Sequence, residues 1–140
     1  MFFDFALTVP ANTPASAPLE QLVTLVGGEI TWWQIQFPRG CVGLVHVKVR
    51  DELHQVIPIN SDGDVSGDDQ RIDTFDSIVL NDDPFNLRLV GWNDDDSYPH
   101  TITFRFAVRS EAEIKRLASA FRALDFLDKW FSQQTPTPAR

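Results

Sequence analysis

Apolar and polar residues alternate along most of the first 109 positions, as they do in half-buried β-strands. The clearest run is 43–50, where three valines alternate with His46, Lys48 and Arg50. The other predicted strands cover 3–9, 19–26, 30–37, 54–59, 72–80, 85–91 and 101–109. Turn residues separate these runs. Eight short strands at this spacing predict a mainly β protein, an antiparallel sandwich with jelly-roll topology, and an immunoglobulin-like sandwich is the alternative.

The pattern changes to a helical one at Ser110. Ser110 and Glu113 have the spacing of a capping box, and 111–131 contains neither Pro nor Gly. One broad apolar stripe is formed by Ile114, Leu117, Ala118, Phe121, Leu124, Leu127 and Phe131. Phe126 and Trp130 lie outside it, on roughly the opposite side. We predict an amphipathic C-terminal helix over 110–131, with one face for the sandwich and a second surface for a partner.

Prolines mark two further segments. The segment 10–18 is predicted to be an extended arm, because its three prolines cannot donate to a sheet. The segment 132–140 reads as an extended polar tail. The predicted organisation is therefore a sandwich domain over 1–109, the helix and the tail. The predicted interface consists of Pro10, Pro14, Phe126, Trp130 and Phe131.

The charge of the chain restricts its partners. The net charge is −8, and residues 1–109 hold 16 acidic and 7 basic residues. Nucleic acid and anionic membrane surfaces both need clustered Lys and Arg, so neither is expected to bind directly. No apolar run approaches the ~20 residues of a membrane span. The single cysteine, Cys41, is predicted to be a small buried apolar residue.

Two acidic loops suggest a calcium site. If each strand crosses the sandwich once, the loops 10–18, 38–42, 60–71 and 93–99 share one end. Carboxylates around flexible glycines are ligands that Ca²⁺ prefers. The candidate ligands are Asp62, Asp64, Asp68, Asp94 and Asp96, with Asp95 nearby. The alternative is that these residues form turns and keep the loops solvated.

The histidines do not indicate an enzyme. His46, His54 and His100 have no nucleophile or metal ligand at a recognisable spacing. His100 follows the acidic loop, so we expect it to hydrogen-bond a carboxylate there. The chain is predicted to be non-enzymatic.

Three aromatic residues suggest glycan binding as a further possibility. Trp32 faces away from the apolar side of its strand, and Trp92 and Tyr98 flank the acidic loop. Such residues can stack on sugars. The alternative is that Trp92 and Tyr98 cover the end of the sandwich, while Trp32 packs beneath the helix or the arm.

Three motifs resemble those of small β-sandwich proteins that occur in tailed phages and prophages. They are Ala11-Asn12-Thr13-Pro14, Phe37-Pro38-Arg39-Gly40-Cys41-Val42-Gly43-Leu44-Val45 and Gly91-Trp92-Asn93-Asp94-Asp95-Asp96-Ser97-Tyr98-Pro99-His100. The resemblance covers roughly residues 8–108. It implies a virion component such as a capsid decoration (cement) protein, and it transfers no functional residues.

The predicted function is therefore that of a non-enzymatic structural protein of a phage virion. It is expected to form homo-oligomers and to bind a major capsid or other virion protein. It would be made in the host cytoplasm. The alternative is a carbohydrate-binding module that depends on Ca²⁺ or on an aromatic platform.

Overall fold

A computed structural model of the chain describes residues 1–52 and 54–134. Within these residues there are nine strands and one helix. The strands are β1 (Phe2–Val9), β2 (Leu19–Leu25), β3 (Gly28–Phe37), β4 (Val45–Arg50), β5 (Gln55–Ile57), β6 (Val65–Ser66), β7 (Gln70–Leu80), β8 (Phe85–Asn93) and β9 (His100–Ser110). The helix is α1 (Glu111–Gln134). The ninth strand, β6, is a two-residue segment within the loop predicted at 60–71, and it pairs with β4.

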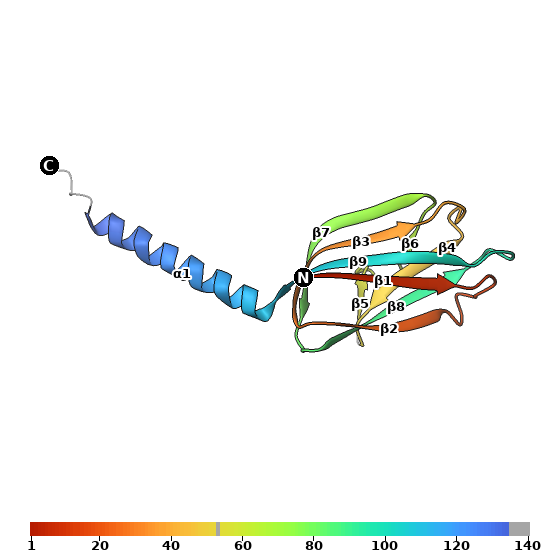
Figure 1. Ribbon diagram of the computed structural model, residues 1–140, viewed down its shortest axis with the longest axis horizontal. Helices are drawn as coiled ribbons and strands as arrows, with labels where there is room; N and C mark the ends of the chain where they lie inside the picture. Colours follow the sequence, from red (N-terminus) through yellow and green to blue (C-terminus); the bar gives the residue numbers. More distant parts are fainter. Residues whose placement is uncertain (53, 135–140) are drawn as a thin grey trace.

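The strands form two antiparallel sheets in jelly-roll order (Figure 1). One sheet has the order β1-β9-β3-β7 and the other has the order β2-β8-β4-β5. The pairs are nested: β1 pairs with β9, β2 with β8, β3 with β7 and β4 with β5. This nesting is that of one long hairpin wound into two layers. The predicted mainly β sandwich with a C-terminal helix is confirmed, and the jelly roll holds over the immunoglobulin-like alternative.

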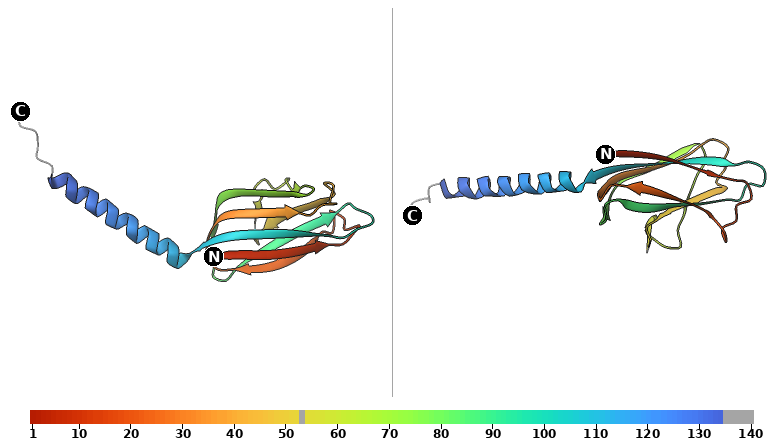
Figure 2. Two further views of the ribbon diagram at one scale, coloured as in Figure 1. Left: turned by 45° about the horizontal axis from the view of Figure 1, so that its top comes forward. Right: turned by 60° about the horizontal axis from the view of Figure 1, so that its bottom comes forward.

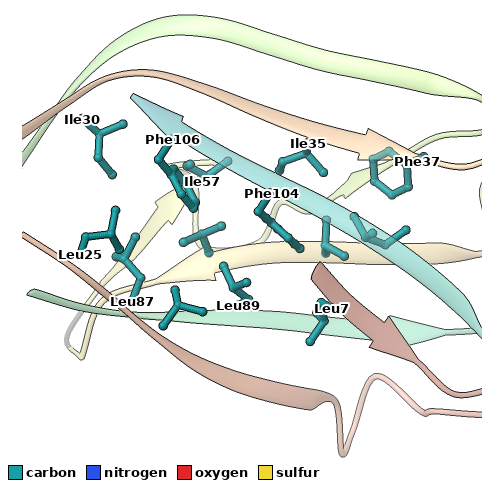
Figure 3. Close-up of a cluster of buried hydrophobic side chains, with 14 of the residues drawn as sticks. Leu7, Leu25, Ile30, Ile35, Phe37, Ile57, Leu87, Leu89, Phe104 and Phe106 are labelled. Atoms are coloured by element: carbon teal, nitrogen blue, oxygen red, sulfur yellow. The ribbon is translucent and has the colours of Figure 1, made fainter. Parts of the chain in front are cut away.

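The core lies between the two sheets (Figure 3). Along β4 the three valines are fully buried and the residues between them are partly exposed, as the alternation predicts. Phe104 and Phe106 of β9 are also fully buried. They face leucines of β8 across the sandwich, so large side chains of both layers fill the interior. Cys41 is buried in the same core, as predicted.

The four loops that the strand count assigned to one end lie at the opposite end of the sandwich from the helix (Figure 1). At one end, the Asn12 amide donates to the Asp95 carbonyl and the Asp69 amide donates to the Pro38 carbonyl. These bonds join the four loops in two pairs, 10–18 with 93–99 and 38–42 with 60–71. The chain terminus Met1 and the start of α1 lie at the other end.

Helix α1 projects away from the sandwich. The capping box at its start is confirmed: the Glu113 side chain accepts from the Ser110 amide at 2.9 Å, and the Ser110 hydroxyl accepts from the Glu113 amide at 3.2 Å. The helix continues to Gln134, three residues beyond the predicted end. None of its residues is buried, and it lies on neither sheet in any view (Figure 2). The predicted tail lies outside the described residues from 135 onward.

Candidate functional site

Helix α1 has a large group of exposed apolar side chains. Seven large apolar residues on it are between 40% and 67% exposed. They are Leu117, Phe121, Leu124, Phe126, Leu127, Trp130 and Phe131. Isolated helices in water gain little stability without packing of an apolar face. An array of this size on a projecting helix makes it the candidate interaction surface of the molecule.

The predicted interface residues of the helix are all exposed. The Trp130 and Phe131 rings meet edge to face at 5.1 Å between centroids, and Phe126 is 66% exposed. The expectation that one helix face packs on the sandwich is wrong. The helix follows β9 without an intervening residue and points outward, so the sandwich cannot reach the stripe. Both faces are available to partners.

The proline-rich segment is not a free arm. The Asn93 amide donates to the Thr13 carbonyl at 2.9 Å, and the Asn12 amide donates to the Asp95 carbonyl at 2.8 Å. These bonds fasten the β1–β2 connection to the loop between β8 and β9. Pro10 and Pro14 are exposed on it. They can touch a partner only from the loop end of the sandwich, far from the helix.

The predicted calcium ligands form hydrogen bonds and ion pairs with other protein groups. Asp68 accepts a hydrogen bond from the Gly40 amide at 2.8 Å, and backbone amides of Val42 and Gly40 hold its pKa below the usual 3.8. Asp62 accepts from Asn60, and Asp96 accepts from Ser97. Across residues 1–52 and 54–134, no group of three or more His, Cys, Asp or Glu side chains could hold a metal ion. Asp62, Asp68 and Asp96 therefore accept hydrogen bonds from protein groups, and the calcium site stays a prediction.

His46 joins the two acidic loops, a role that sequence reasoning missed. Its Nδ1 lies 2.8 Å from Asp64 Oδ1, and its Nε2 lies 3.3 Å from Asp94 Oδ2. Its ring stacks on Trp92 with 5.2 Å between centroids. The sequence gives one signal for this arrangement, because His46 points outward from β4 beside those loops. The Asp64 and Asp94 carboxylates thus both contact the His46 imidazole.

Asp95 and His100 form the buried polar centre of the loop end. His100 Nε2 donates to Asp95 Oδ2 at 2.8 Å, which confirms the expected contact with a carboxylate. The other Asp95 oxygen accepts from the amides of Ser97 and Tyr98. The His100 hydrogen bond and then the Ser97 amide hold the Asp95 pKa below the usual 3.8. This arrangement fixes a turn.

We expect Asp95→Asn to destabilise the protein at neutral pH and to matter less in acid. The folded state binds a proton at Asp95 less tightly than the unfolded chain does. The stabilisation is therefore present above about pH 4 and is lost as the pH falls through the lowered pKa. Urea unfolding between pH 7 and pH 2.5 measures this stabilisation. The difference in free energy of unfolding between wild type and variant should shrink toward low pH. Asp82→Asn, in an exposed turn, is the control and should run parallel to wild type at every pH.

The three candidate glycan-stacking aromatics do not form one platform. Trp92 lies on β8 of one sheet, where its ring contacts His46 and has Lys48 Nζ at 5.7 Å from its centroid. Trp32 lies on β3 of the other sheet and donates to Asp73 at 3.3 Å. Tyr98 is exposed at the loop end.

Trp32 belongs to an apolar row that sequence reasoning missed. In register across four strands lie Phe2, Ala107, Trp32 and Phe75. Phe2 and Phe75 are exposed, so the row faces outward and does not lie beneath the helix. Each strand contributes one residue, so no single segment of the sequence shows the row. It adds a second exposed apolar surface to that of the helix.

Comparisons with known proteins assign no family. No family model matches the chain, and no curated protein matches it. Among solved structures, the Yersinia pseudotuberculosis-derived mitogen (YPM) is similar, with a TM-score of 0.38 and 7% identity. The match covers 79% of this chain and 88% of that one. A similarity at this level supports no inference about function. No helix in the described part of the chain is long and apolar enough to cross a membrane.

Proposed function

We propose that this chain is a non-enzymatic structural protein of a tailed-phage virion, acting as a decoration protein that attaches to a capsid shell. The observation that carries the proposal is helix α1, which is joined directly to a rigid jelly roll and has seven exposed large apolar residues. A decoration protein needs a stable body and an attachment element that stays exposed until assembly. The sandwich and the helix meet these two needs separately.

Two other features support the proposal. The motifs of the sequence resemble those of phage β-sandwich proteins over the part that forms the jelly roll. The outward row of Phe2, Trp32 and Phe75 adds apolar surface on the sandwich itself. Exposed apolar patches of this kind are typical of proteins that are covered in an assembly.

Shell attachment is expected to depend on Phe126 and Trp130, the two aromatic residues outside the apolar stripe. We expect the double variant Phe126→Ala, Trp130→Ala to bind about tenfold or more weakly, because buried aromatics dominate interface energies. The assay is co-sedimentation with shells assembled from the major capsid protein of the same genome. Near-UV circular dichroism should be unchanged apart from the lost Trp130 signal, since neither side chain contacts the sandwich.

The control is Tyr98→Ala, which removes an aromatic residue that is 67% exposed at the opposite end of the molecule. It should co-sediment like the wild type. If the double variant binds the shells as well as the wild type does, the helix is not the attachment element. If the wild type does not bind at all, the proposed function is wrong.

A further inference from the structure

The stripe on helix α1 has the spacing of a coiled-coil seam. Counting from Ile114, alternate steps of three and four residues reach six positions along the helix. These positions are Ile114, Leu117, Phe121, Leu124, Asp128 and Phe131. Five of the six are apolar, and the series runs through the whole helix from Glu111 to Gln134. Phe126 and Trp130 fall outside this seam.

We propose that the seam is covered by the same helix of a second copy of the chain. Residues 111–134 hold four acidic and four basic side chains, so two such helices approach without net repulsion. A second copy also supplies a seam of the same length and period. The two helices would overlap over about 36 Å, since each residue adds about 1.5 Å.

The seam and its flanking Leu127 provide most of the apolar surface that such a pair needs. A specific interface buries roughly 800 Å² per partner, and a fully buried aromatic side chain contributes about 150–250 Å². Phe121 and Phe131 are 67% and 61% exposed, and Leu124 is 60% exposed. These residues, together with Leu117 and the flanking Leu127, supply most of the required area.

The charges favour an antiparallel pair. In a parallel pair each seam residue would meet its own equivalent, so two Asp128 carboxylates would face each other. The two sandwiches, each with 16 acidic and 7 basic residues, would also lie side by side. In an antiparallel pair the sandwiches lie at opposite ends, separated by several times the Debye length of about 8 Å. Opposed helix dipoles add to this preference.

In one antiparallel register, every seam residue lies opposite a seam residue of the second copy. It places Ile114 opposite Phe131, Leu117 opposite Asp128, and Phe121 opposite Leu124 of the second copy. The same register matches Glu111 with Gln134, so the two helices overlap over their full length. The twofold axis then passes between Arg122 and Ala123. No aspartate faces its equivalent in this arrangement.

In this pair, Phe126 and Trp130 of both helices lie on the outer surface. The inference therefore deepens the proposed function, since it rests on the helix being the interaction element and assigns its two faces to different partners. The seam holds two copies together, and the outer aromatics remain for the shell. These two roles are tested by different variants.

The first experiment compares two matched phenylalanines in the full chain. By sedimentation equilibrium we expect the wild type at twice its 15.9 kDa mass. Phe121→Ala should weaken the dimer by about 30-fold or more, because it removes a central seam residue from both helices. Phe126→Ala removes the same side chain with the same exposure, 66% against 67%, and should leave the dimer constant within about threefold. A monomeric wild type, or equal effects of the two variants, would overturn the proposal.

The second experiment tests the direction by disulfide formation. Leu117→Cys and Asp128→Cys are prepared separately and oxidised with copper phenanthroline, alone and as a mixture. An antiparallel pair forms the disulfide only in the mixture, because residues 117 and 128 are about 16 Å apart along one helix. Cross-linking of each variant with itself would show a parallel pair and contradict the register. Native Cys41 does not interfere, since it is buried and burial raises its thiol pKa to about 11.

The two proposals fail separately. Dimers that do not bind shells would contradict the virion role and leave the helix pair intact. Monomers that bind shells through Phe126 and Trp130 would support attachment and contradict the pair.

Discussion

Replacing Phe104 with alanine is expected to lower the free energy of unfolding by about 3–5 kcal/mol, the cost of removing a large aromatic side chain from a packed core. Phe104 is fully buried on β9, where its neighbours in register are Phe5 of β1 and Ile35 of β3. Its side chain fills the space between the two sheets (Figure 3). The rigid strands cannot close the resulting cavity, so the lost contacts are not recovered.

Urea unfolding monitored by tryptophan fluorescence measures this change. The matched control is Phe75→Ala, which removes the same side chain from a strand position that is 86% exposed. It should alter the free energy by about 0.5 kcal/mol or less. Equal effects of the two variants would mean that β9 does not lie at the centre of the core.

The second large loss of stability is expected for Gly28→Ala, beside the start of helix α1. Gly28 has a φ of +149°, and a Cβ there would clash with the Arg109 carbonyl oxygen. Both the backbone conformation and the contact exclude a side chain. We expect a loss of about 2–4 kcal/mol, because a strained φ costs about 1–3 kcal/mol and the strand pairing must also shift.

Gly43→Ala separates these two causes. Gly43 also has a positive φ, +71°, but a Cβ there meets nothing within 4 Å. Its replacement should cost only the conformational strain, about 1–2 kcal/mol. Urea unfolding of both variants gives the comparison. If Gly28→Ala costs no more than Gly43→Ala, β3 and β9 are not tightly paired beside the helix.

Much of the fold follows from the sequence because alternation directly reports which side of a strand is buried. The valines of β4 and the inward residues of β9 illustrate this. Counting strands also placed the acidic loops at one end, since each long strand crosses the sandwich once. Strand β6 was missed because two residues, Val65 and Ser66, are too few to show a period.

The binding partners of the loop carboxylates could not be predicted from composition alone. Whether Asp68 binds a cation or a backbone amide depends on Gly40, which is 28 residues away and reaches it only through folding. In the same way, Asp64 and Asp94 resemble metal ligands until β4 places His46 between them. The sequence shows the two faces of helix α1. Whether the sandwich covers one of them depends on the direction in which the helix leaves β9.

The direct junction between β9 and α1 also determines how the molecule bears mechanical load. Ser110 ends the strand and Glu111 begins the helix, so a pull on the helix acts on β9 without an intervening hinge. Strand β9 is hydrogen-bonded along its length to β1 on one side and to β3 on the other. A force along the strand loads these bonds together in shear, so they do not open one after another. A molecule held by its helix would therefore pass the load to both strands that flank β9, β1 and β3.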